Sequence, residues 1–299
     1  MIGEVKRRGA LNVDSLERAF ADNPVVRFDH ANVSDRVPII GTVAKSLHIS
    51  NLFLDIGPKE YPSKSIGQDC IVITGFDEQK EKAANIESVI KCCRLRTFEQ
   101  GNGVRVHFGK CTISNCHISD SDSFLRVKGA SVTVEGTMAR NLSGLGVSLE
   151  DEGTEGKFVD CKFINIQRYG IMQFGKSKSS LVSHCEFMNC GHDDPDSPSC
   201  ALMIDCGATR VEHSLFHGIS TFGMSVEGVS DVVVEHNTFT KNQYGLSISC
   251  SGVTASVKHN EFIGHDVGAM CHLNQDLGTI VFAENKVPLT LALLIGGLY

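Results

Sequence analysis

The stretch CGHDDPDSPSC, residues 190–200, gathers side chains that could bind a metal ion or transfer protons. Carboxylates at this density can bind Ca²⁺, and two neighbouring carboxylates can act as general acid and base. Its two prolines and its polarity are equally typical of a solvated loop that protrudes from a fold. We favour the loop, and we expect it to lie beside a binding face. Its ionisable residues are His192, Asp193, Asp194 and Asp196.

A second pattern pairs a histidine with a small polar residue at regular intervals. The small residues are Cys116, Cys161, Cys185, Ser214, Asn237 and Asn260. The last four of them follow His184, His213, His236 and His259 directly. Imidazoles in a straight row do not converge tetrahedrally on one ion. We therefore predict buried residues that hydrogen-bond the turns, with the histidines stacked beside them and no metal. Cysteine pairs with tandem zinc-ligand spacing are absent from the sequence.

Both patterns belong to a repeat. Segments such as FGMSVEGVSDVVVEHNTF and YGLSISCSGVTASVKHNEF each contain a short alternating strand, a turn and a second strand. Six of the seven steps between repeat starts are 21 to 24 residues, and the step of 31 contains the acidic stretch. This period, with short strands and no helical pattern, predicts parallel β-coils stacked on one another. The starts are Gly103, Phe124, Gly146, Gly170, Ala201, Gly223, Gly245 and Gly268.

The copies EHNTF and KHNEF look like the parallel β-helix repeats of the pectin-lyase-like family, which residues 46–287 resemble. The resemblance implies an all-β, right-handed parallel β-helix of about 9–11 coils. We expect residues 1–45 to form an N-terminal cap with a short helix in VDSLERAFADNP. Residues 46–299 then form one continuous domain, with loop insertions near 75–88 and 191–199. The resemblance is closest in character to intracellular interaction domains, such as those of F-box proteins and the Shc SH2-domain-binding protein family.

The outward face of the first strand in each coil is where the resembled family usually binds ligands. Alternate residues after each start should share this face. They change from basic to apolar to acidic along the repeats, and an apolar zone between charged zones suits a protein or peptide ligand. The predicted binding residues are Arg105, Arg126, Lys128, Glu150, Met172, Phe174, Met203, Asp205 and Glu227, with His192 from the loop.

Composition limits the partners and the location. The formal net charge of −7 and the absence of Trp argue against nucleic acid as a ligand. No run of 18 apolar residues predicts a membrane span, and the first residues contain no apolar signal segment. Twelve cysteines without such a signal favour reduced, mostly buried thiols. We therefore expect a cytoplasmic protein.

Three functions are consistent with these features. We favour a non-catalytic interaction or scaffold β-helix that binds a protein or peptide and needs no cofactor. The alternative is a carbohydrate-active lyase, hydrolase or epimerase, for which Ca²⁺ becomes a candidate cofactor. The polygalacturonase-like members of the resembled family have a His-Gly and an Arg-Ile-Lys at positions that this chain does not match. A structural part of a larger assembly is third, based on the apolar VPLTLALLIGGLY. The residues of the enzymatic alternative are Asp193, Asp194, Asp205, Glu227, Lys128 and His107.

Overall fold

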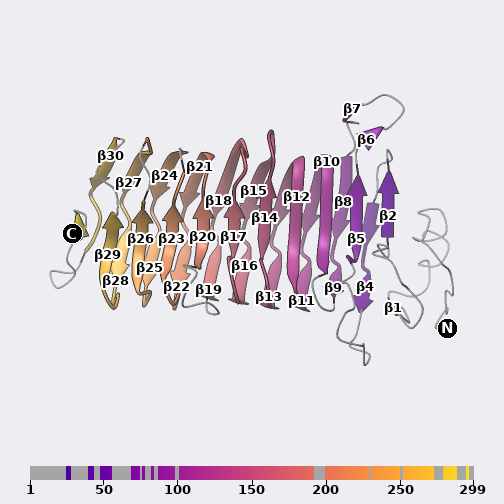
Figure 1. Ribbon diagram of the computed structural model, residues 1–299. Coiled ribbons are helices and arrows are strands. Elements are labelled where there is room, and N and C mark those ends of the chain that lie inside the picture. Colours follow the sequence, from indigo (N-terminus) through magenta and orange to yellow (C-terminus); the bar gives the residue numbers. More distant parts are fainter. Residues whose placement is uncertain are drawn as a thin grey trace, which may run out of the picture.

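The computed structural model is a parallel β-solenoid whose coils stack along one axis (Figure 1). The described part of the chain contains strands and turns but no helix, and it has no helix long and apolar enough to cross a membrane. The expected all-β architecture is confirmed. The structure describes residues 25–27, 40–43, 48–55, 69–74, 76–77, 82–83, 87–97, 101–191, 199–228, 230–249, 252–272, 279–287 and 294–295.

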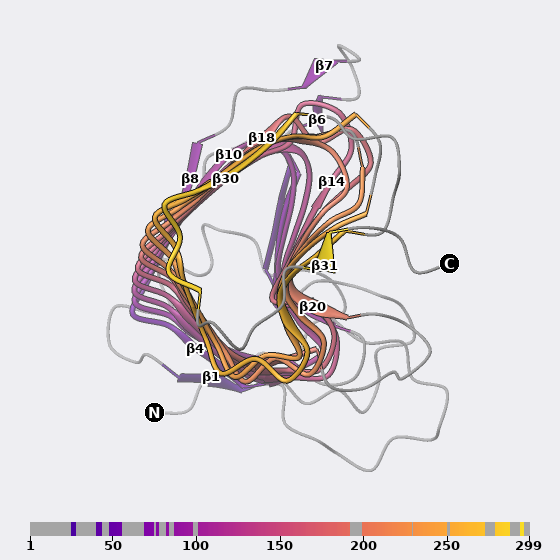
Figure 2. The same ribbon diagram turned by 90° about the vertical axis from the view of Figure 1, so that its left-hand side faces the viewer.

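Each coil contributes a first, a second and a third strand to three sheet faces, which an end view shows as the walls of the solenoid (Figure 2). The first strands are β2 (Ile40–Val43), β5 (Ile71–Thr74), the first halves of β10 (Asn102–Ser114) and β12 (Ser123–Glu135), β14 (Val147–Glu150), β17 (Ile171–Gln173), β20 (Cys200–Ile204), β23 (Phe222–Val226), β26 (Tyr244–Ile248), β29 (Gly268–His272) and β31 (Leu294–Ile295). The second strands are β3 (His48–Ser50), β8 (Glu87–Lys91), the second halves of β10 and β12, β15 (Glu155–Val159), β18 (Ser179–Ser183), β21 (Gly207–Glu212), β24 (Ser230–Glu235), β27 (Thr254–Lys258) and β30 (Ile280–Ala283).

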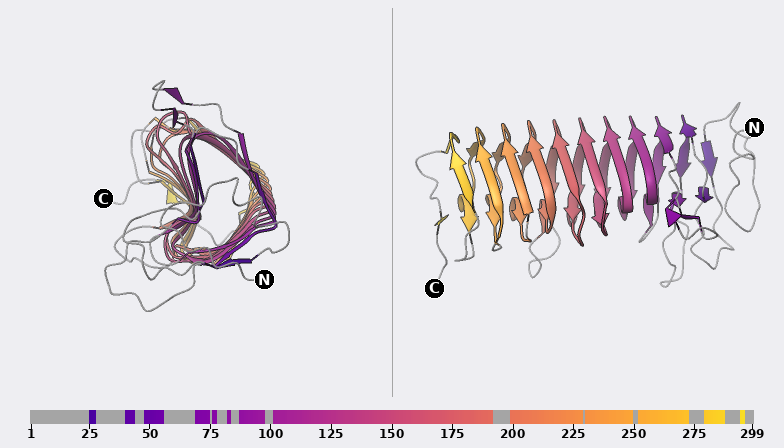
Figure 3. Two further views of the ribbon diagram at one scale, coloured as in Figure 1. Left: turned by 90° about the vertical axis from the view of Figure 1, so that its right-hand side faces the viewer. Right: turned by 90° about the horizontal axis from the view of Figure 1, so that it is seen from above.

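The third strands form a separate sheet of ten parallel strands, which lie side by side along the lower edge of the solenoid in Figure 1. Figure 3 shows the stacked coils from above. They are β1 (Val25–Arg27), β4 (Phe53–Asp55), β9 (Arg94–Arg96), β11 (His117–Ser121), β13 (Met138–Leu142), β16 (Lys162–Ile166), β19 (Glu186–Cys190), β22 (Leu215–His217), β25 (Thr238–Thr240) and β28 (Glu261–Ile263). An antiparallel pair, β6 (Phe76–Asp77) and β7 (Lys82–Ala83), projects from the solenoid body within the predicted insertion at 75–88 (Figure 2).

The register confirms seven of the eight predicted repeat starts. Val104 pairs with Leu125 and Leu125 with Val147, so residues 103, 124 and 146 are equivalent. The last start is wrong by one residue, because Tyr244 pairs with Gly268 and the equivalent of Gly245 is therefore Ala269. Small residues suit these positions because successive coils approach closely: a Cβ at Gly146 would lie 2.2 Å from the carbonyl oxygen of Gly170.

The interior consists of identical or similar side chains stacked from coil to coil. Its clearest column is a row of phenylalanine rings on the third strands, with neighbouring centroids 4.7 to 5.0 Å apart and nearly parallel planes. All five rings are essentially inaccessible to solvent. This spacing is that of hydrogen-bonded parallel strands, so the ring stack and the backbone ladder support the same register. The column comprises Phe163, Phe187, Phe216, Phe239 and Phe262.

The turn between the second and third strands carries the predicted polar ladder. The backbone N–H of Ser214 donates to Asn237 Oδ1 at 2.9 Å, and the N–H of Asn237 donates to Asn260 Oδ1 at 2.9 Å. Asn237 Nδ2 donates to the carbonyls of Val211 and Glu235. In earlier coils, buried thiols take these places, and Cys185 Sγ donates to the carbonyl of Ser183. The predicted role of these residues is confirmed.

The residue before each ladder member has a left-handed backbone conformation. The four histidines have φ between 50 and 57°, a region in which Asn, Asp and His are enriched among residues with a side chain. Their exposed rings stack in the predicted row, with centroids 4.9 to 5.1 Å apart. The sharp turn therefore directs each imidazole outward while the next residue points into the solenoid.

Two predictions on the first 45 residues have different outcomes. The helix expected in residues 13–24 lies outside the described residues. Two described segments of this region are strands: β1 pairs with β4, and β2 pairs with β5. Parallel sheet therefore includes residues on the N-terminal side of position 46.

The polar ladder should carry a measurable share of the stability. Replacing Asn237 by Ala leaves the buried N–H of Ser214 and the carbonyl of Val211 without partners. We expect the free energy of unfolding to fall by about 2–4 kcal/mol in urea denaturation. Asn237→Ser is the matched control, because Ser214 fills the equivalent position one coil earlier and accepts a backbone N–H there. Equal losses in the two variants would contradict a hydrogen-bonding role.

Candidate binding face on the first strands

Strict register brings the predicted first-strand residues into two rows on one outward face. In the first row Arg105 pairs with Arg126, Arg126 with Ser148, and Ser148 with Met172. The row continues through Met203, Ser225 and Ser247. The second row begins with His107, Lys128 and Glu150. In the first row Arg105, Arg126, Met172 and Met203 are partly exposed, whereas Ser148, Ser225 and Ser247 are themselves buried.

The basic end of this face is built around an imidazole. Arg105 forms an ion pair with Asp69 at 2.9 Å, and both side chains are largely buried. His107 is half-buried, and its Nε2 has no hydrogen-bond partner. Burial lowers the pKa of His107, and the charges of Arg105, Lys128 and Arg126 lower it further, against a smaller opposite effect of Glu150. His107 is therefore a neutral imidazole among cations at neutral pH.

Glu150 is the most enclosed charge of the face, with a side chain 6% exposed. Arg126 Nε lies 2.7 Å from its Oε1, Lys128 Nζ lies 3.0 Å from its Oε2, and Ser148 Oγ donates to Oε1 at 2.6 Å. Burial opposes ionisation of the carboxyl, but the hydrogen bonds from Arg126, Ser148 and Lys128 outweigh it and lower the pKa. Glu150 is therefore a fixed carboxylate that holds two basic side chains of the neighbouring strand β12.

The middle and far end of the face are apolar and then acidic. Met172 and Met203 are adjacent in the first row and half-buried, and Phe174 follows β17 with similar exposure. Beyond them Asp205 is exposed, and Glu227 accepts a hydrogen bond from Ser225 Oγ at 3.0 Å. The order basic, apolar, acidic along the axis is the order expected from the sequence.

The structure describes only the two ends of the acidic loop, Gly191 and Ser199. His192, Asp193 and Asp194 lie outside the described residues. The two ends of the loop are tied to the next coil, because Ser220 Oγ donates to the carbonyl of Gly191 and Thr221 Oγ1 donates to the carbonyl of Ser199. Cys200 then begins β20, so the chain re-enters the solenoid directly at the first-strand face.

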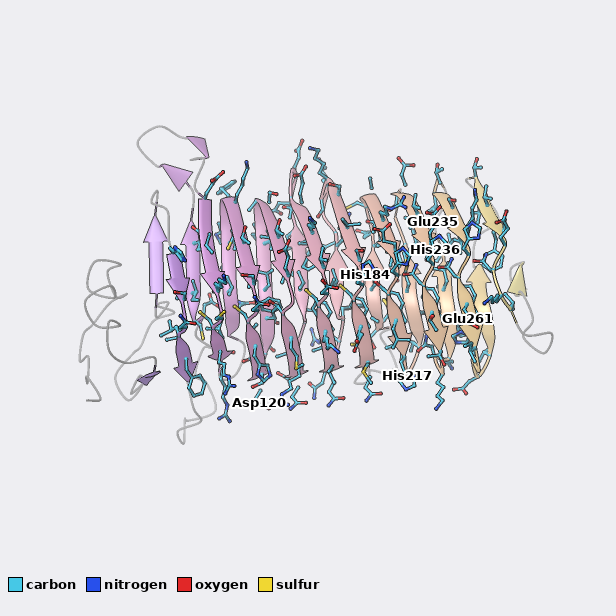
Figure 4. All side chains as sticks on the ribbon, turned by 180° about the vertical axis from the view of Figure 1, so that it is seen from behind. Asp120, His184, His217, Glu235, His236 and Glu261 are labelled. Atoms are coloured by element: carbon cyan, nitrogen blue, oxygen red, sulfur yellow. The ribbon has the colours of Figure 1, made fainter. Side chains whose placement is uncertain are left out.

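Metal-binding chemistry has no support among the described residues, which contain no cluster of three or more His, Cys, Asp or Glu able to hold an ion. The histidine row lies at the turn after the second strands, where Figure 4 shows His184 and His236 along one line with Glu235 beside it. The histidine rings are nearly parallel with centroids about 5 Å apart, so equivalent nitrogens of neighbouring rings do not converge on one metal ion at about 2.1 Å. Glu284 instead lies 3.2 Å from His259 Nδ1.

Sequence reasoning missed two parts of this face. Asp69 lies in an irregular early coil, and only the fold brings it to Arg105. Glu150 and Lys128 are equivalent residues of successive coils, so opposite charges one repeat apart were the available signal for the clamp on Glu150. Of the residues of the enzymatic alternative, Lys128 is held by Glu150 at 3.0 Å.

Comparison with known proteins identifies the fold. Residues 63–192 and residues 125–287 match the sequence model described as "Right handed beta helix region". The chain belongs to this family of right-handed β-helices. The predicted fold and its hand are therefore confirmed. Many unrelated activities and binding functions share such a fold, so membership alone assigns none of them.

No curated protein sequence matches the chain. Among solved structures, it is similar to PfbA, a surface adhesin of Streptococcus pneumoniae, at 10% identity over 88% of this chain and 87% of that one, with a TM-score of 0.35. It is also similar to the tailspike protein of E. coli bacteriophage HK620, solved in complex with a pentasaccharide, at 11% identity over 91% of this chain and 61% of that one, with a TM-score of 0.33. Neither similarity is close enough to transfer a ligand or an activity.

The lowered pKa of His107 predicts a pH dependence of stability. The unfolded chain binds the proton more tightly than the folded one, so stability falls as the pH drops from about 6.5 toward the lower folded value. His107→Gln should flatten this decline between pH 7 and 5 in urea denaturation. The decline should not vanish, because burial also lowers the pKa of His117 and His265. An unchanged slope would contradict the neutral, cation-flanked imidazole.

Proposed function

We propose that the chain is a non-catalytic β-helix that binds a protein or peptide on its first-strand face. The observation that carries the proposal is the order of surface chemistry: a basic end, two adjacent half-buried methionines, and an acidic end within two registered rows. Methionine adapts to irregular apolar surfaces, and charges of opposite sign on either side of it orient a ligand. The partner is an extended segment with an acidic residue, an apolar centre and a basic residue.

The charged groups of the face are suited to recognition. Arg126 and Lys128 reach Glu150 while remaining 40% and 33% exposed, so they can contact a ligand without losing their buried anchor. A pre-positioned side chain loses less conformational entropy on binding than a free one. The same anchoring supports the view that Glu150 is a positioning group and not a proton donor.

An intracellular location is part of the proposal. Ten cysteines in the described residues are free thiols, and eight of them are buried. Burial raises the pKa of Cys111 and Cys190 to about 12, which keeps these thiols protonated and unreactive. A core that relies on reduced thiols is typical of a reducing compartment.

The binding surface can be tested with a displayed library of random twelve-residue peptides selected on the purified protein. We expect enriched peptides with an acidic residue next to apolar ones, bound about tenfold more weakly by Lys128→Gln and by the double variant Met172→Ser/Met203→Ser. Affinities would be measured by isothermal titration calorimetry after thermal melts confirm that the variants are folded.

Lys157→Gln is the matched control, because Lys157 is an exposed lysine on the second-strand face in β15. It should bind the selected peptides as the wild type does. Equal weakening in all three variants, or a library without enrichment, would overturn the proposal.

A second candidate is a uronate-directed lyase, and His107 is the observation that favours it. A neutral imidazole can accept a proton from carbon, and nearby Arg105, Arg126 and Lys128 could neutralise the adjacent carboxylate of a uronic acid. Asp205, Glu227 and the loop residues Asp193 and Asp194 would then be further candidates, with Ca²⁺ as a candidate cofactor.

The two candidates are separated by incubating the protein with uronate-containing polysaccharides, with and without Ca²⁺. We expect no unsaturated-uronate or new anomeric proton signals in the NMR spectrum. Turnover that disappears in His107→Gln or in Asp194→Ala, while Lys157→Gln retains it, would replace the binding proposal by the enzymatic one.

A further inference from the structure

The acidic end of the first-strand face has two carboxylates at equivalent positions of neighbouring strands. The second row continues through Phe174, Asp205 and Glu227, because the backbone N–H of each donates to the carbonyl of the residue before the previous member of the row, at 2.8 to 3.0 Å. Asp205 is exposed, and Glu227 is half-buried. Equivalent positions of adjacent strands are about 5 Å apart, so these two like charges repel each other unless a cation binds beside them.

The chain itself supplies no cation to this pair. Within the described residues, neither Asp205 nor Glu227 forms an ion pair. The Asp205 carboxylate is directed toward the strand of Glu227, because a Cβ added at Gly228 would lie 2.7 Å from Asp205 Oδ1. Two negative charges are therefore held close together on the surface, and a ligand with a positive charge would relieve their repulsion.

A second glutamate of the same face shows how this arrangement binds cations. Ser148 Oγ donates to Glu150 Oε1 at 2.6 Å, and Ser225 Oγ donates to Glu227 Oε1 at 3.0 Å. In both units the serine binds Oε1 of the glutamate two residues later. Glu150 Oε2 then accepts a hydrogen bond from Arg126 Nη2 at 2.9 Å and lies 3.0 Å from Lys128 Nζ. The unit of a serine and a glutamate is thus an acceptor for basic side chains from a neighbouring position.

The unit at Glu227 lacks such cations because the preceding strand has different residues. In register, Arg126 and Lys128 precede the first unit, whereas Met203 and Asp205 precede the second. A methionine takes the place of the arginine, and a carboxylate takes the place of the lysine. The second unit therefore repeats the acceptor of the first and adds a further negative charge, so its basic group has to come from a ligand.

The residues around the carboxylates favour an arginine as this ligand group. Phe174 precedes Asp205 in the second row, Met203 lies two residues before Asp205 on β20, and both are half-buried. Aromatic rings bind guanidinium groups more often than ammonium groups, and methionine packs against the methylenes of a long side chain. The planar fork of a guanidinium can also donate to two carboxylates at once, whereas an ammonium is a point charge.

We propose that Asp205, Glu227 and Phe174 bind the guanidinium group of an arginine in the partner peptide. This inference rests on the proposed function and adds the type of residue that the acidic end recognises. Lys128 and Asp205 are three steps apart in the second row, which is about 14 Å, and an extended chain covers this distance in about four residues. The ligand therefore carries an acidic residue and an arginine about four positions apart, the acidic residue at Lys128 and the arginine at Asp205.

The arginine site is tested first without a peptide, with N-acetylarginine methylamide as the probe and its neutral citrulline analogue as the control. The protein is labelled with [¹³C]methyl methionine, and the Met203 signal is assigned with Met203→Leu. We expect this signal to shift with the arginine probe and not with the citrulline probe. The shift should disappear in the double variant Asp205→Asn/Glu227→Gln, which thermal melts show to be folded.

Asp231→Asn is the matched control, because Asp231 is an exposed carboxylate on the second-strand face in β24. It should bind the arginine probe as the wild type does. An equal response to the citrulline probe would overturn the arginine site. A shift that the folded double variant retains, or that Asp231→Asn loses, would do so as well.

The second measurement uses twelve-residue peptide libraries with a fixed glutamate and an arginine at the fourth following position, and the same libraries with the two residues exchanged. Parallel libraries carry lysine or citrulline in place of arginine. We expect one arginine library to bind about tenfold more tightly than its citrulline counterpart, and the double variant Asp205→Asn/Glu227→Gln to remove this difference. Phe174→Leu should reduce the preference for arginine over lysine about threefold.

The two measurements separate failure of the arginine site from failure of the proposed function. If the libraries bind equally well with arginine and with citrulline, the arginine site is wrong and the peptide-binding face stands. If the arginine probe binds as expected but no library binds, the guanidinium site stands and the peptide-binding function is wrong.

Discussion

The structure depends on one constraint, which is that every coil must pair with its neighbours in parallel register at the hydrogen-bonding distance of strands. A side chain that points into the solenoid then meets the equivalent side chain of the next coil at about 5 Å. Flat rings and short amides satisfy this repeatedly, as Phe187 on Phe216 and Asn237 on Asn260 do. A one-residue slip would turn a whole coil inside out, so the repeated residue types are a direct consequence of the register.

The same constraint governs the turns. Each turn between the second and third strands must change the direction of the chain within two residues. One residue therefore takes a left-handed conformation with its side chain outside, and the next residue fills the interior. His184, His213 and His236 occupy the first position and are stacked outside, while their successors satisfy the turn backbone inside. The histidine row is thus explained by backbone geometry and ring stacking, without a ligand.

Inside the solenoid the register stacks like residues, whereas on the outer surface it brings unlike residues together. Arg126 and Glu150 are 24 positions apart and meet because their coils are adjacent. The result is a surface whose charges are mostly paired between coils, with methionine between the charged zones of the first-strand face. Among the described residues, the third-strand face departs from this rule at Arg94 and Arg140, whose exposed guanidinium groups form no ion pair.

The sequence alone determined the repeat, the all-β fold, the polar ladder with its stacked histidines and the first-strand row. These depend on local alternation and on a fixed period, which are visible in one dimension. It misplaced the last coil by one residue, because Gly268 and Ala269 are both small enough to begin a strand. Tertiary structure decided which charges are neutralised. Asp69 reaches Arg105, and Glu150 is enclosed by Arg126 and Lys128, whereas Arg94 and Arg140 flank His117 without partners. Such pairing depends on side-chain reach across adjacent coils, and a sequence period gives the row of a residue but not the contact that its side chain makes.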